Sequence, residues 1–120
     1  MPFACRLGVR SAAMSDAMTR LRNAAVERAV RGAGASSADA RRAAFDHAHV
    51  PAAAAALVDK IVHAAWTIGD EDIAAAKAAG LSEDEIFEIA ICAAYGQAMR
   101  QLDAGLAALA AASAKTGGAG

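Results

Sequence analysis

The stretch that decides the fold is IVHAAWTIGDEDIAAAKAAGLSEDEIFEIAICAAYGQAMRQLDAGLAAL, residues 61–109. Gly80 stands where a helix commonly ends on a left-handed residue. Ser82 and Glu85 follow with the spacing of a capping box, in which each side chain accepts a hydrogen bond from the other residue's backbone N–H. One helix is therefore predicted to end at Gly80, and a long one to run from Glu83 to about Ala112.

The long helix is apolar on nearly every side between residues 86 and 98. Such a helix usually lies at the centre of a bundle or between subunits. Gly96 and Gly105 each cost about 1 kcal/mol of helix stability relative to alanine. We expect close approach of another helix to compensate for both.

Upstream, helical spacing of apolar residues predicts a helix from Ser15, as N-cap, to about residue 31. Ser36 and Asp39 resemble a second capping box, with a helix starting near Ser37. Pro51 then forces a break and suits the start of a third helix.

The third helix carries the clearest apolar stripe, which consists of Leu57, Val58, Ile61, Val62, Ala65 and Trp66. Gly69 ends it, and Asp70 is predicted to cap a short helix from Glu71 to Ala79. No strand-like alternation occurs in the sequence. We therefore predict an all-α domain of five or six helices over residues 15–113, between a flexible arm (1–14) and a flexible tail (114–120).

The composition limits the class of protein. At 120 residues the chain has the size of one domain, and 57% of it is hydrophobic but only 4% aromatic. Because alanine buries little area, the core is expected to be thin and to be completed by association with other chains.

A net charge of −1 gives no basic surface for nucleic acid or anionic lipid. No apolar run has the length of a membrane span or the form of a signal peptide. Cys5 and Cys92 form no secreted disulfide framework. We expect a cytoplasmic protein of bacterial type, and Met14 is an alternative to Met1 as the native start.

Residues 57–109 resemble the carboxymuconolactone decarboxylase and alkylhydroperoxidase D-like superfamily. The likeness lies in the turn AAGLSEDEI and in the final helix AAYGQAMRQLDAGLAAL. It implies an alkylhydroperoxidase D-like helical bundle. It also implies self-association as a trimer or hexamer, or association with a related family subunit.

The redox centre of that family is missing from this chain. Aligned on Gly80, the two cysteines of the family's CxxC would fall near Ala65 and Ile68, its histidine near Asp72, and its upstream glutamate near Ala53. A dithiol peroxidase needs an attacking and a resolving thiol. We therefore do not expect that activity.

The remaining candidate site is one face of the last helix. Glu88, Cys92 and Tyr95 lie at i, i+4 and i+7. The carboxylate could serve as a base or proton relay for the thiol, and the tyrosine could donate to an oxyanion. The alternatives are a buried structural cysteine and a Glu88 ion pair that fixes helix register, and these are favoured.

His63 is the fourth candidate, because it lies four residues after Asp59 and could be oriented by it for proton transfer. Packing at a surface or interface is the favoured alternative. His47 and His49 point to opposite sides of a helix and fit no metal-binding pattern. No metal or cofactor is expected.

These observations favour a homo-oligomeric, non-catalytic accessory or small-molecule-binding subunit that holds a small apolar molecule between its helices. The alternative is an antioxidant-type or decarboxylase-type enzyme of the same superfamily, acting through Glu88, Cys92, Tyr95 and His63.

Overall fold

The computed structural model describes residues 2–118, with side chains described for residues 16–115. Its elements are α1 (Pro2–Arg31), α2 (Ala38–Asp46), α3 (Ala52–Ala64), the 3₁₀ helix η1 (Ala65–Thr67), α4 (Asp70–Ala78) and α5 (Glu83–Gly118). No strand occurs among the described residues, so the predicted all-α class is confirmed. None of these helices is long and apolar enough to cross a bilayer.

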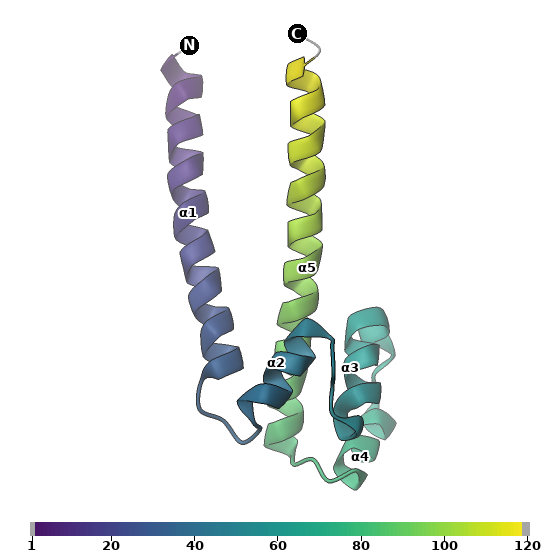
Figure 1. The fold of residues 1–120 in the computed structure, drawn as a ribbon. Helices are drawn as coiled ribbons and strands as arrows, with labels where there is room; N and C mark the ends of the chain where they lie inside the picture. Colours follow the sequence, from purple (N-terminus) through teal and green to yellow (C-terminus); the bar gives the residue numbers. More distant parts are fainter. Residues whose placement is uncertain (1, 119–120) are drawn as a thin grey trace.

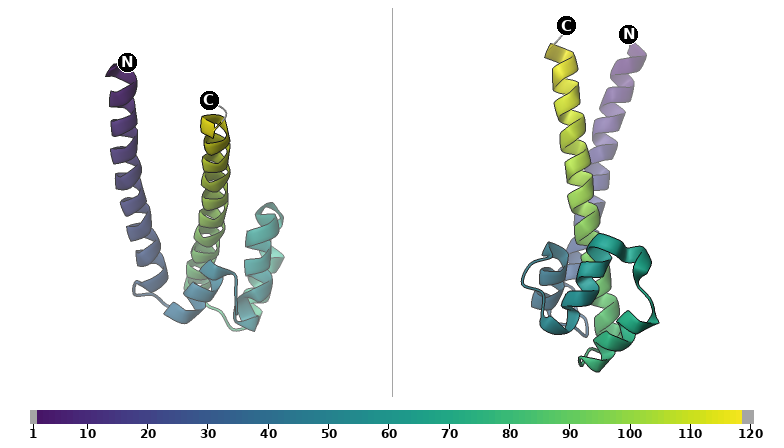
Figure 2. Two further views of the ribbon diagram at one scale, coloured as in Figure 1. Left: turned by 45° about the horizontal axis from the view of Figure 1, so that its top comes forward. Right: turned by 90° about the vertical axis from the view of Figure 1, so that its right-hand side faces the viewer.

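The molecule consists of a base and two arms (Figures 1 and 2). Helices α2, α3 and α4 gather around the first half of α5, and this assembly is the base. The arms are residues 2–25 of α1 and residues 101–118 of α5, which project from the base in the same direction. The radius of gyration is 18.9 Å, compared with about 13.6 Å for a compact domain of this length.

The two helix boundaries predicted around Gly80 are confirmed. Gly80 has φ 107°, and Leu81 N donates to Ala76 O at 3.2 Å, which closes α4 with a Schellman motif. Ser82 and Glu85 form the reciprocal capping box: Glu85 N donates to Ser82 Oγ, and Ser82 N to Glu85 Oε1.

Helix α1 begins at Pro2, so the start predicted at Ser15 is wrong. No proline lies between Pro2 and Arg31, and the alanine-rich sequence around Ser15 favours continuation of the helix. At the other end of the chain, α5 continues past Ala112 to Gly118.

Two predicted N-caps are displaced by one residue. Ser37, rather than Ser36, caps α2 through a hydrogen bond from Ala40 N to its Oγ at 3.1 Å. Gly69, rather than Asp70, is the N-cap of α4. At each site a side chain from farther along the chain binds one of the two residues. Glu88 binds Ser36, the predicted cap of α2, and the Asp72 carboxylate accepts a hydrogen bond at 3.0 Å from the backbone N of Gly69, the actual cap of α4.

The core lies where α5 crosses α2 and α3. The buried members of its larger cluster are Val30, Ala44, Ala54, Val58, Ile89, Cys92 and Ala93, and a second buried cluster consists of Leu57, Ala76 and Ile86. The apolar stripe of α3 points inward only in part, because Trp66 is 83% exposed. It lies in η1, where the change in helix type turns it away from the α3 stripe.

Gly96 confirms the expected close approach. A Cβ there would lie 1.8 Å from Phe45 O, so α2 packs directly on the α5 backbone. The same expectation is wrong for Gly105 within one chain, because no described atom lies within 4 Å of the position of its Cβ. Gly105 lies on the α5 arm, beyond the base.

Candidate functional site

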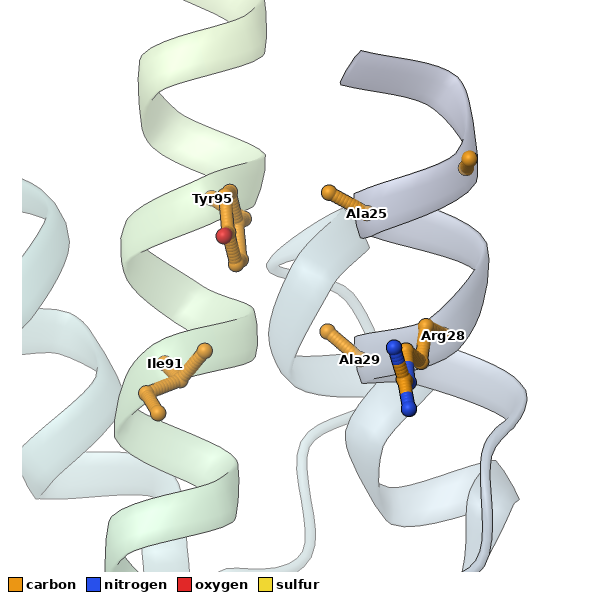
Figure 3. A pocket seen from close by; sticks show the side chains of 6 residues that line it. Ala25, Arg28, Ala29, Ile91 and Tyr95 are labelled. Atoms are coloured by element: carbon orange, nitrogen blue, oxygen red, sulfur yellow. The ribbon is translucent and has the colours of Figure 1, made fainter. Parts of the chain in front are cut away.

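A cleft separates α1 from α5 just above the base. It encloses a hollow of about 510 Å³ lined by Ala24, Ala25, Arg28, Ala29, Ile91 and Tyr95. Figure 3 shows Tyr95 and Ile91 of α5 facing Ala25 and Ala29 of α1. The space exists because α1 presents mainly alanine methyl groups there, which are too short to fill the distance between the two helices.

A second hollow of about 190 Å³ adjoins the first and shares Arg28, Ala29 and Ile91 with it. Arg41 of α2 lines it and is only 4% exposed. Its Nη1 donates to Ala29 O at 3.0 Å, while its Nε has no hydrogen-bond partner among the described residues. One end of an apolar cleft therefore carries two guanidinium groups.

Glu88 lines the same hollow, but both of its oxygens are engaged. Oε1 accepts from Ala35 N, and Oε2 accepts from Ser36 N, each at 2.7 Å; the Ser36 hydroxyl also donates to Oε2. These donors, together with the charge of Arg41, hold the pKa of Glu88 below its ordinary value. Glu88 thus ties the α1–α2 loop to α5.

The loop fits this carboxylate closely. A Cβ at Gly34 would lie 2.6 Å from Glu88 Oε1, so a larger residue there would require the carboxylate to shift. The favoured prediction for Glu88 was an ion pair that fixes helix register. The actual partners are backbone N–H groups and a serine hydroxyl of the same chain.

Cys92 is a core residue. It is 1% exposed, and its Sγ donates to Ala29 O at 3.5 Å. Burial is the main cause that raises the pKa of the thiol, with a further contribution from Glu88 and an opposing one from Arg41. The favoured structural interpretation of this cysteine accords with its burial.

Tyr95 is half-buried and lies along the larger hollow. The predicted face of α5 therefore divides: Glu88 binds a loop, Cys92 enters the core, and Tyr95 faces the cleft.

His63 lies on a different side of α5. It lines a separate hollow of about 300 Å³ between α3 and α5, together with Trp66 and Gln97. Asp59 does not orient it as predicted, because Asp59 Oδ1 binds His47 Nε2 at 2.7 Å. His47 in turn packs edge-on against His63, with ring centroids 5.5 Å apart. His63 therefore shares no hollow with Glu88 or Tyr95.

The sequence alone did not indicate Arg28 and Arg41 as parts of the site. Nothing in the local sequence separates Arg41, which is buried, from its neighbour Arg42, which is exposed and pairs with Asp46 at 3.0 Å. Their difference arises only from packing against α1. Among the described residues, no cluster of histidine, cysteine, aspartate or glutamate could hold a metal ion.

Comparisons of this chain with protein-family models, curated proteins and solved structures found no match. The resemblance to the carboxymuconolactone decarboxylase and alkylhydroperoxidase D-like superfamily stays a prediction.

Proposed function

We propose that the protein is a binding subunit whose α1–α5 cleft holds a small apolar molecule with an anionic end group. The observation that carries the proposal is the arginine pair, Arg28 and Arg41, at one end of a mostly apolar cleft, where the carboxylate of Glu88 is already engaged by its loop donors. Ligand sites are commonly of this kind: a concave, mostly apolar wall with a few polar groups that fix orientation.

The buried Nε of Arg41 supports an anionic end group. A buried donor without a partner costs about 1–3 kcal/mol, and a carboxylate that reaches Nε after a shift of the Arg41 side chain would remove that cost. Glu88 does not do so, because its oxygens already accept hydrogen bonds from Ala35 and Ser36. Arginine is also the side chain best suited to bind a carboxylate through two parallel hydrogen bonds.

Binding explains the site better than catalysis by the predicted residues does. Catalysis would require Glu88 to leave its loop donors and Cys92 to leave the core, and His63 lies elsewhere. We propose in addition that the chain is a divergent relative of the alkylhydroperoxidase D-like bundle that kept the helices and lost the dithiol.

The test uses decanoate as the probe, with decanol as the uncharged control, in titration calorimetry. We expect decanoate to bind more tightly than decanol, because only the former has a charge for the arginines. Arg28→Met should weaken decanoate binding about tenfold, the effect of losing one charge-assisted hydrogen bond. Arg28 is exposed on α1, so its replacement should leave the base folded.

The matched control is Arg31→Met, one turn further along α1, where the guanidinium pairs with Glu27 and lines neither hollow of the cleft. Its affinity for decanoate should equal that of the unmodified chain. Equal affinity of decanoate and decanol, or equal losses in the two arginine variants, would contradict the proposal.

Self-association is the second part of the proposal. It is supported by the thin, alanine-rich core and by the length of helix that extends beyond the base. Sedimentation equilibrium tests it directly, and a monomer at all concentrations up to about 100 μM would refute this part alone.

A further inference from the structure

The two arms expose large apolar side chains that a lone chain cannot bury. Every residue from 101 to 115 of α5 is exposed, including Leu102, Leu106 and Leu109 at 41%, 51% and 63%. On α1, Met18 and Leu21 are 63% and 68% exposed.

These residues follow the spacing of a coiled coil. Tyr95, Met99, Leu102, Leu106 and Leu109 are alternately four and three residues apart, and we call them the α5 seam. Met18, Leu21 and Ala25 keep the same spacing on α1, and we call them the α1 seam. Apolar residues repeating every 3.5 positions form the seam along which helices pack in coiled coils and bundles.

The described side chains of the α5 arm lack tertiary packing. Most helix stability in proteins comes from the packing of an apolar face rather than from helix propensity. Gly105 lowers helix propensity further, and no described atom lies within 4 Å of its Cβ position to compensate. Among the side chains that the structure describes, the arm therefore has no packing partner beyond the base.

The chain exposes more surface than a compact monomer of its mass, and the excess is comparable with the area that one subunit buries in a stable dimer. A folded monomer of 12.0 kDa exposes about 6,000 Å², whereas this chain exposes 8312 Å². The excess of about 2,300 Å² lies at the upper end of what one subunit contributes to an obligate interface, about 1,000–2,500 Å². A peptide or small ligand on one seam would cover only part of it.

We infer that a second copy of this chain docks on the arms through the α1 and α5 seams and forms a two-fold, four-helix bundle. This inference rests on the self-association part of the proposed function and names its surface and stoichiometry. A two-fold interface requires the same surface on both partners, and the arms offer two antiparallel helices with matching seams. The net charge of −1 leaves little repulsion between copies.

The cleft lies where the arms leave the base, between Ala25 of α1 and Tyr95 of α5, both of which are seam residues. A second pair of arms packed on the seams would therefore cover its outer side. The dimer thus joins the two parts of the function: association through the arms closes the binding cleft.

The test places two lysines on the seam and compares them with two lysines off it. Leu102→Lys/Leu106→Lys puts charges on the α5 seam, whereas Ala104→Lys/Ala111→Lys adds the same charges to the opposite face of the same arm. We expect the unmodified chain and the off-seam variant to sediment at twice the 12.0 kDa chain mass. The seam variant should sediment at the chain mass, with dissociation constant raised at least 100-fold.

Circular dichroism and urea unfolding check that the seam variant keeps the base, whose core contains neither leucine. A dimer that persists in the seam variant would contradict the proposed docking surface but not self-association itself. A monomeric unmodified chain, or a trimer or hexamer, would overturn the two-fold dimer. Decanoate binding is compared between the Arg28→Met and Arg31→Met variants, which both keep the seams, so their difference reports on the cleft.

Discussion

The contacts of Glu88 in the structure differ from the ion pair that the sequence predicted. Its position in an apolar helix predicts a buried charge in need of a partner, and the partner is the α1–α2 loop. The carboxylate accepts hydrogen bonds from the backbone N–H groups of that loop and so holds the end of α1 against α5. The arrangement of donors around the Glu88 carboxylate therefore serves the folded structure.

We expect Glu88→Gln to lower the free energy of unfolding by about 2 kcal/mol, because an amide cannot accept from all three donors and leaves at least one unsatisfied. Urea unfolding measures the difference. Glu27→Gln is the control, since Glu27 makes only an exposed ion pair with Arg31 at 3.4 Å. Equal stability of the two variants would contradict the structural role.

The same carboxylate predicts a dependence on pH. The hydrogen bonds from Ser36 and Ala35 hold the pKa of Glu88 below its ordinary value of 4.5 in the folded chain. Its contribution to stability is therefore full above pH 4.5 and is lost as the pH falls through the lowered pKa. Asp72 and Glu83 also have lowered pKa values, through Lys60 and Lys77.

Acid should thus destabilise the chain below pH 4.5, and the fall should be shallower in Glu88→Gln. Urea unfolding at a series of pH values between 3 and 7 measures it. Parallel curves for the variant and the unmodified chain would show that Glu88 does not titrate with a lowered pKa.

Cys92 should be inert in the folded chain. Its burial and its raised pKa both oppose formation of the reactive thiolate. In a Cys5→Ser background, we expect a thiol reagent to modify Cys92 only at the rate of unfolding, and rapidly in denaturant. Fast modification without denaturant would instead support the catalytic alternative.

At the scale of the element, the two glycines of α5 have opposite roles. Gly96 lies against the Phe45 carbonyl, where an added methyl would displace α2. We expect Gly96→Ala to destabilise the chain by about 1–3 kcal/mol. Gly105→Ala should stabilise α5 by up to about 1 kcal/mol, since no described atom opposes the new methyl.

Thermal unfolding of both glycine variants at one protein concentration checks this prediction. The opposite signs are the diagnostic result, because helix propensity alone would make both substitutions stabilising. A stabilised Gly96→Ala would mean that α2 does not pack on the α5 backbone.

At the scale of the whole molecule, the stability should depend on protein concentration. If the arms are completed by a second copy, unfolding is coupled to dissociation, and the melting temperature rises with concentration. We expect this rise between about 5 and 200 μM in the unmodified chain and its absence in Leu102→Lys/Leu106→Lys. A melting temperature independent of concentration in both chains would contradict coupling.

The sequence predicted helices from local signals, but it did not show the effect of contacts between residues that are far apart in the chain. Gly80, Ser82 and Glu85 act within a few residues of each other, so their motifs could be recognised directly. The N-cap of α2 moved from Ser36 to Ser37 because Glu88, far along the chain, holds Ser36. No local pattern contains that contact.

The same distinction applies to the candidate site. Helical spacing correctly placed Glu88, Cys92 and Tyr95 on one helix, but it could not say what each would face. Arg41 and the alanines of α1 form the cleft together with Tyr95, although they come from three different helices. His63 lies near Glu88 in neither sequence nor space.

By itself, the sequence determined the all-α class, the end of α4, the start of α5, and the requirement for a close neighbour at Gly96. These follow from hydrogen bonds and steric limits that span at most a few residues. Only the tertiary structure decided that Glu88 binds a loop, that Arg41 is buried beside an apolar cleft, and that two long arms lie exposed. The reason is that burial and ion binding depend on which helices meet, and that is set by packing across the whole chain.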